Sequence, residues 1–242
     1  MRRLLCMPLL LLMASAPAES QGEIELFNGR DFSGWTYFLE ETDFNIGGKG
    51  KISDFATIKP GGIIEIKPRM HGALMTTRDY LNYRLRVEFR WPSPGPRDDS
   101  GLFLRIRPPY VWDTVHGEQA RFYMFQLQPG NTGDLWVLGY SESQLKTDPG
   151  RSYKPFGTLE LAPGGHIRRH LKSSDAEKPA GEWNTLEAVV EGKTIKAYVN
   201  GRLVNEGTGL VDLPGRIGLE SERGSIQFRN LKLLPLPGGN QP

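Results

Sequence analysis

Apolar and polar residues alternate with a period of two along much of the chain. In residues 83–91 every odd position is apolar, and the even positions between them are arginine or glutamate. This alternation is typical of a β-strand with one buried and one wet face, because successive side chains of a strand point to opposite sides. Comparable runs occur at 101–107, 122–128, 134–140, 186–190 and 195–199. The pattern predicts a protein built from many short strands.

Turn residues separate these runs. The 29 glycines and 18 prolines interrupt helices but suit turns, and Asn200-Gly201 is a favoured two-residue hairpin connection. At the end of the chain Ile226 and Phe228 share one phase while Leu231 and Leu233 share the other, which predicts a β-bulge near 229–230. We expect an all-β sandwich of two antiparallel sheets packed through their apolar faces. It forms a single domain over residues 23–234, followed by a disordered tail at 235–242.

The same alternation sorts the polar side chains. Leu102, Leu104 and Ile106 are expected on one face of their strand, opposite Phe103, Arg105 and Arg107. Asp134 and Trp136 share a face of a later strand. A carboxylate two residues from an aromatic ring suits the stacking of a sugar.

The N-terminus has the features of a secretory signal peptide. Two arginines follow Met1, an apolar run extends from Leu4 to Met13, and small residues precede an expected cleavage near Ala18. The sequence therefore predicts export, to the periplasm or the exterior, with residues 1–18 removed. The single cysteine, Cys6, lies in this segment, so the mature chain is expected to lack disulfides.

Charge and motifs exclude several functions. Removing residues 1–18 would change the formal net charge from +2 to zero, which does not fit a nucleic-acid-binding protein. No apolar stretch after residue 18 is long enough to span a membrane. Phosphate-binding glycine loops, His-Glu-x-x-His, Gly-x-Ser-x-Gly and the Glu-x-Asp-x-x-Glu strand motif of jelly-roll glucanases are all absent. Retaining hydrolysis by two strand carboxylates is thus disfavoured.

Several phrases along the chain, in this order, resemble one bacterial family, the 3-keto-disaccharide hydrolase domain family, also described as 3-keto-glucoside lyase/hydratase. They are 26–35 (LFNGRDFSGW), 72–77 (GALMTT), 83–90 (YRLRVEFR), 100–105 (SGLFLR), 132–136 (TGDLW), 177–184 (EKPAGEWN), 215–222 (GRIGLESE) and 226–230 (IQFRN). The resemblance implies a concanavalin-A-like jelly roll whose concave sheet carries a carbohydrate ligand. Residues 92–99, 108–121 and 141–182 are then expected to be loops around that face.

The resemblance also implies an unusual chemistry. In a sugar oxidised at C3 the ketone acidifies the C2 proton, a base removes it, and the C1–O glycosidic bond breaks by elimination; water then adds. Such a site needs a base, a cation or donor for the enolate oxygen, and an acid for the leaving group. No cofactor is expected, and a sugar dehydrogenase is the expected upstream partner.

Four residues are the candidates for catalysis. Arg105 could hold the enolate oxygen, or could instead form an ion pair with Glu88. Glu222 could act as acid or base, or could be an exposed strand carboxylate. Asp134 could take part in the chemistry or cap the turn before it, and Gln126 matches a glutamine of the family.

Other residues are candidates for binding. Trp136, Arg107, Phe103 and His116 are expected to contact the sugar, and Asp98-Asp99 could cap a turn or bind calcium; any other metal site is left open. The family usually has glutamate where this chain has Met124, and a thioether cannot act as a base. A non-catalytic lectin-like module and a structural jelly roll therefore remain alternatives to an enzyme.

Overall fold

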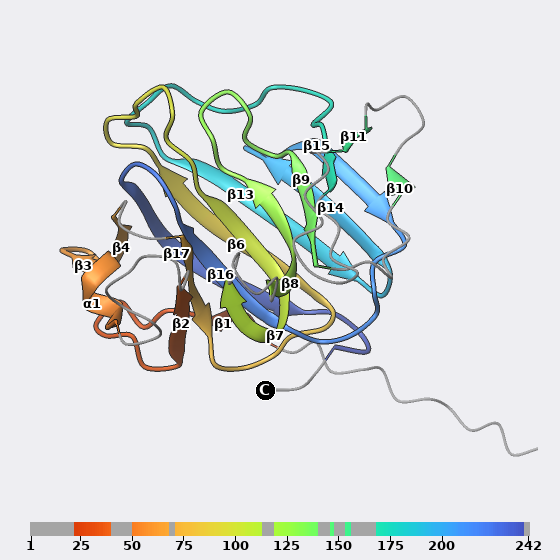
Figure 1. The fold of residues 1–242 in the computed structure, drawn as a ribbon, viewed down its shortest axis with the longest axis horizontal. Helices are drawn as coiled ribbons and strands as arrows, with labels where there is room; N and C mark the ends of the chain where they lie inside the picture. The colour runs from red at the N-terminus through yellow and green to blue at the C-terminus, as the bar shows by residue number, and fades with distance from the viewer. Residues whose placement is uncertain are drawn as a thin grey trace, which may run out of the picture.

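Two antiparallel sheets form nearly all of the regular structure in the computed structural model (Figure 1). The structure describes residues 22–39, 50–67, 71–112, 119–139, 146–147, 153–155 and 168–239. The only helix in this part of the chain is the short α1 (Ile52–Phe55). The predicted all-β sandwich is therefore confirmed. Residues 1–18, on which the prediction of export rests, lie outside the described residues.

The first sheet is centred on the long strands that the alternation predicted. Its order is β10 (Lys146–Thr147), β15 (Arg202–Thr208), β14 (Thr194–Val199), β13 (Asn184–Glu191), β6 (Tyr83–Arg90), β17 (Ile226–Pro235), β4 (Ile63–Ile66) and β3 (Ala56–Lys59), and β1 (Ile24–Glu25) pairs with β17. The Asn200-Gly201 hairpin joins β14 to β15, and the bulge in β17 falls between Arg229 and Lys232. Both local predictions are confirmed.

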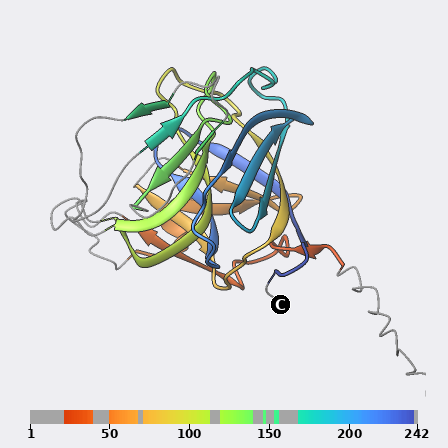
Figure 2. The same ribbon diagram turned by 90° about the vertical axis from the view of Figure 1, so that its right-hand side faces the viewer.

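The second sheet carries the candidate site. Its order is β11 (Tyr153–Pro155), β12 (Arg168–His170), β9 (Leu135–Leu138), β8 (Gln119–Gln126), β7 (Gly101–Trp112), β16 (Arg216–Ser221), β5 (Gly72–Thr76) and β2 (Trp35–Leu39). Figure 2 shows β7 and β8 as strongly bent strands. Leu102, Leu104 and Leu219 face the first sheet and belong to the main core.

The other face of the second sheet, called the outer face below, has an apolar cluster of its own. Phe103 and Phe122 stack there with their ring centroids 4.0 Å apart, and Met75, Ile106 and Met124 pack around them. Phe103 is fully buried, so its side chain offers no surface to a sugar in this structure, contrary to the prediction. One part of the outer face is thus a second small core.

Arg105 does not lie on the outer face. Its backbone has φ +51°, and the register of β7 against β8 shifts between Leu104 and Arg107. This bulge reverses the alternation, so that Ile106 joins Phe103 on the outer face. The prediction that Arg105 shares a face with Phe103 is therefore wrong.

The Arg105 guanidinium is buried against loops at the ends of first-sheet strands. One terminal nitrogen donates to the carbonyl of Val211 at 2.7 Å, and the other donates to those of Leu81 at 2.9 Å and Gly192 at 2.8 Å. The residue is 0% exposed. Arg105 thus ties three loops together instead of forming the ion pair with Glu88.

Three predicted boundaries need correction. β7 continues to Trp112 and β8 begins at Gln119, so 108–121 is not one loop, while 141–182 contains β10, β11 and β12. The C-terminal segment is ordered further than expected, since the backbone nitrogen of Leu236 donates to the carbonyl of Asn82 at 3.1 Å. No helix within the described ranges has the length and apolar character needed to cross a membrane.

Candidate functional site

Strand register arranges the outer face in rows. In one row Arg169 lies opposite Trp136, Trp136 opposite Met124, and Met124 opposite Phe103. The next row contains Gln126, which lies opposite Gly101, and Glu220, which lies opposite Ala73. Polar groups from β8 and β16 therefore border an apolar and aromatic row.

Gly101 is the point where the side chains of β8 and β16 meet. The sulfur of Met124 and Oε2 of Glu220 lie 2.5 and 2.8 Å from the position that a Cβ on Gly101 would occupy. Real side chains do not approach so closely, so any larger residue would displace both. Glycine here allows the Glu220 carboxylate to lie beside Met124.

Three carboxylates, Asp99, Glu220 and Glu222, form the carboxylate cluster. Each offers an oxygen within 4.8 Å of the others. Glu220 is 5% exposed, and within the described part of the chain its Oε2 has no hydrogen-bond partner. Asp99 is held next to β16 by two backbone hydrogen bonds with Arg223, of 2.9 and 3.0 Å. Like charges have therefore been brought together at a place with little water.

Burial and mutual repulsion change the acidity of this cluster. Burial, followed by the negative charges of Glu222 and Asp99, raises the pKa of Glu220 well above its ordinary range. Burial and the charge of Glu222 also raise the pKa of Asp99 to about 7. Arg223 offsets part of the charge by donating to Glu222 Oε1 at 2.5 Å, and His71 lies 3.9 Å from the same oxygen.

Two chemical uses follow from this arrangement. A protonated Glu220 beside other carboxylates can give a proton while a neighbour accepts one, as in acid–base catalysis. The same oxygens could instead hold a cation that prefers oxygen ligands, such as Ca²⁺. Asp99, first considered for calcium, belongs to this cluster, whereas Asp98 accepts a hydrogen bond of 2.8 Å from the backbone of Gly95.

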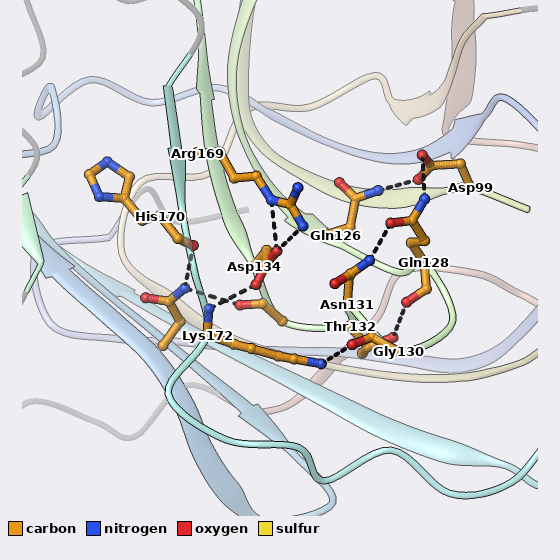
Figure 3. A network of polar contacts seen from close by, with 12 residues as sticks. Asp99, Gln126, Gln128, Gly130, Asn131, Thr132, Asp134, Arg169, His170 and Lys172 are labelled. Atoms are coloured by element: carbon orange, nitrogen blue, oxygen red, sulfur yellow. Dashed lines mark hydrogen bonds and ion pairs between the residues drawn. The ribbon is translucent and has the colours of Figure 1, made fainter. Parts of the chain in front are cut away.

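Gln126 connects the cluster to the neighbouring strands. Its Nε2 donates to Asp99, as Gln128 does at 3.3 Å (Figure 3). Gln126 is 4% exposed, and its Oε1 accepts no hydrogen bond from the described residues. The structure thus brings Gln126 and Glu222 to one site, together with Asp99 and Glu220.

Asp134 lies beside Gln126 but is fully engaged. Its Oδ2 accepts hydrogen bonds from Arg169, at 2.8 Å from Nε and also from Nη2, and its Oδ1 accepts one of 2.8 Å from the Lys172 backbone (Figure 3). Asp134 is 1% exposed. These contacts suit a carboxylate that fixes a cation, and they do not fit the predicted part in the chemistry or a side-chain cap on the preceding turn.

The remaining candidates divide between this site and other places. Trp136 is half-buried on the outer face, with the Arg169 guanidinium carbon 5.3 Å from its ring centroid. Arg107 donates to the carbonyl of Pro214 at 2.8 Å, on a part of β7 away from the cluster. His116 lies outside the described residues. Trp136 therefore joins the site, whereas Arg107 does not.

Sequence reasoning did not identify Glu220 or Arg169 as members of the site, and it considered Asp99 only as a turn cap or a calcium ligand. Glu220 has the same phase as Glu222, so the alternation could have found it. Arg169 gave no signal, because its strand is three residues long within a segment predicted to be a loop. Only its pairing with β9 brings it opposite Trp136.

Several solved structures share the fold. A Parabacteroides distasonis protein provisionally described as a glycosyl hydrolase has a TM-score of 0.58 at 16% identity, covering 89% of this chain and 94% of its own. The Bacillus licheniformis beta-glucanase has a TM-score of 0.54 at 15% identity, covering 91% of this chain and 100% of its own. The carbohydrate-binding module CBM66 from Bacillus subtilis has a TM-score of 0.50 at 12% identity, covering 82% of this chain and 93% of its own. At these identities the likeness shows the fold alone, and it confirms the predicted concanavalin-A-like jelly roll.

Sequence comparison gives the family. No curated protein matches the chain. The model of a family described as the 3-keto-alpha-glucoside-1,2-lyase-like domain matches residues 22–234. The predicted resemblance is confirmed by this match, which covers most of the chain. The protein therefore belongs to the carbohydrate-active family of 3-keto-alpha-glucoside-1,2-lyase-like domains.

Proposed function

We propose that the protein cleaves 3-keto-glucosides at the carboxylate cluster, by removal of the C2 proton and elimination at C1. The observation that carries this proposal is the buried carboxyl of Glu220, whose pKa is raised by burial and by two neighbouring carboxylates. A group held in this way is uncommon unless it serves a function. Family membership supplies the substrate class that the proposal names.

Glu222 is the proposed base and Glu220 the proposed acid. Glu222, whose side chain is 14% exposed, removes the proton from C2, and the C–H electrons form an enolate with its charge on the C3 oxygen. The enolate then restores the ketone, a C1=C2 double bond forms, and the C1–O bond breaks. Glu220 gives its proton to the departing alkoxide. Addition of water to the double bond would complete a net hydrolysis.

Met124 is compatible with this assignment. The resemblance implies a glutamate at this position, and β8 lacks it here. The carboxylate of Glu220 lies over Gly101 beside the Met124 sulfur. We infer that β16 supplies the carboxylate that β8 does not, so the loss of one glutamate does not remove the acid–base groups.

A glycan-binding module is the second candidate function. The half-buried ring of Trp136 next to buried polar groups favours it, since such a surface can bind a sugar without reacting. The two functions differ in what happens to a bound 3-keto sugar. The proposal includes an upstream sugar dehydrogenase, because the oxidised substrate must be made before it is cleaved. It also includes export of the protein, directed by residues 1–18.

Product analysis tests the proposal. The mature protein is incubated with a 3-keto-glucoside and with its unoxidised parent, and the aglycone and the unsaturated keto sugar are followed by chromatography. Release of aglycone from the keto form alone is the expected result. Saturable binding of both sugars without release would instead make the protein a glycan-binding module.

A further inference from the structure

Arg169 is a cation held in a fixed position on the outer face. Its Nε and Nη2 both donate to Oδ2 of Asp134, and its guanidinium lies over the Trp136 ring. Asp134 is itself buried and fixed through the backbone of Lys172. A guanidinium held on one edge by a buried carboxylate has lost most of its freedom before any ligand arrives.

The remaining edge of this guanidinium makes no hydrogen bond with the described residues. Nη1 lies at this edge, and in Figure 3 no dashed line reaches one of the guanidinium nitrogens. The side chain is 24% exposed, so the group is neither sealed in the core nor fully solvated. Two N–H donors at the edge of a site match an oxygen that carries negative charge.

Arg169 also lies within electrostatic reach of the carboxylate cluster. Asp134 and Gln126 are neighbours, joined by a backbone hydrogen bond of 2.9 Å, and Gln126 in turn contacts Asp99. The positive charge of Arg169 is one of those that lower the pKa of Asp99. The site thus has a fixed cation on one side and carboxylates on the other.

We infer that Nη1 of Arg169 binds the C3 keto oxygen of the oxidised sugar and holds the negative charge that forms there. When a carboxylate of the cluster takes the C2 proton, the C–H electron pair moves into a C2=C3 double bond and the C3–O π pair moves onto oxygen. Donors fixed in advance at this oxygen stabilise the enolate more than the ketone. Asp134 is then a positioning residue, and Arg169 takes the role first predicted for Arg105. The inference rests on the proposed function.

Deuterium exchange isolates this step. A 3-keto C-glucoside has no C1–O bond to an aglycone, so in D2O the protein should exchange its C2 hydrogen without releasing an aglycone, which NMR can follow. Arg169→Gln should slow this exchange about 10²–10³-fold, the size expected for losing one oxyanion donor. With the cleavable 3-keto-glucoside, kcat should fall by a similar factor, while KM should rise by a much smaller factor.

Three variants give the controls. Arg216→Gln removes an arginine that also covers an aromatic ring, 4.2 Å from the Tyr110 centroid, and should leave both rates unchanged. Arg169→Lys should recover only part of the rate, because an ammonium does not keep the bidentate contact with Asp134. Asp134→Asn should lower kcat less than Arg169→Gln does. Thermal unfolding of each variant separates loss of fold from loss of function.

The outcomes distinguish this inference from the proposed function. Normal exchange by Arg169→Gln, or a raised KM with unchanged kcat, would overturn the inference while leaving the function intact. If the wild-type protein neither exchanges nor cleaves, the proposed function fails, and the role of Arg169 is then tested by measuring the binding of both sugars. The Arg169→Gln change should then weaken binding of the keto sugar but not of its parent. Equal loss of both, or tighter wild-type binding of a glucuronoside than of the keto sugar, would contradict it.

Discussion

Two ionisable side chains that are buried on strands of the second sheet, Arg105 on β7 and Glu220 on β16, differ in their surroundings. The terminal nitrogens of Arg105 donate to three backbone carbonyls at one end of the sandwich. Glu220 lies beside two other carboxylates, with one oxygen that has no partner among the described residues. Backbone carbonyls stabilise the first charge in the folded state, whereas the second is destabilised by its neighbours. A buried charge with fixed partners indicates a structural role, and one held among like charges indicates a site that can react.

Replacing Arg105 should have the largest effect on stability. Arg105→Ala leaves three loop carbonyls without their donor and creates a cavity, so it should lower the free energy of unfolding by about 3–5 kcal/mol. Urea denaturation measures this. Arg107→Ala, which removes a single carbonyl contact, should lower it by about 1 kcal/mol. Equal stabilities of these two variants would contradict the structural role assigned to Arg105.

Replacing Glu220 should have the opposite effects on stability and activity. Glu220→Gln should lower kcat on a 3-keto-glucoside about 10²–10⁴-fold, because the amide cannot give a proton to the leaving group. Because the pKa of Glu220 is raised in the folded state, ionisation of this carboxyl lowers the free energy of unfolding as the pH rises above the group's ordinary pKa of 4.5. The variant should therefore melt at a higher temperature than the wild type at pH 8 and near the same temperature at pH 4. An active variant that melts lower at pH 8 would contradict this assignment.

Filling the space over Gly101 should disturb the site more than the fold. In Gly101→Ala the new methyl group would meet the flexible ends of Met124 and Glu220, which can move at a small cost of about 1 kcal/mol. Moving the Glu220 carboxyl should still reduce kcat at least tenfold. Ser100→Ala, which removes a 3.0 Å hydrogen bond to the Glu220 backbone, is a neighbouring control for stability. Unchanged turnover by Gly101→Ala would show that the place of this carboxyl is not critical.

Asp99 should give the smallest effect, a change in pH dependence. Its pKa of about 7 exceeds the ordinary value of 3.8, so the wild-type protein should lose stability as the pH rises toward and through 7. Asp99→Asn should reduce this loss between pH 5 and pH 8, as measured by thermal unfolding at several pH values. Parallel curves for the two proteins would show that Asp99 does not share the charge of the cluster.

The comparison also shows how far the sequence could predict this molecule. Alternation located β6 and β13 and the face of Glu222, because these depend on local periodicity. It placed Arg105 on the wrong face, since a single residue with positive φ reverses the phase of β7. Arg169 and the burial of Glu220 depend on pairing between distant strands, which periodicity does not encode.

Cleavage of a 3-keto-glucoside in D2O tests the central claim most directly. At short reaction times NMR should show aglycone release together with a sugar product that has lost its C2 hydrogen, either as the unsaturated keto sugar or as a hydrated sugar with deuterium at C2. The parent glucoside and the Glu220→Gln variant should give neither product. A released sugar that retains its C2 hydrogen, or equal cleavage of the parent glucoside, would contradict elimination at the carboxylate cluster.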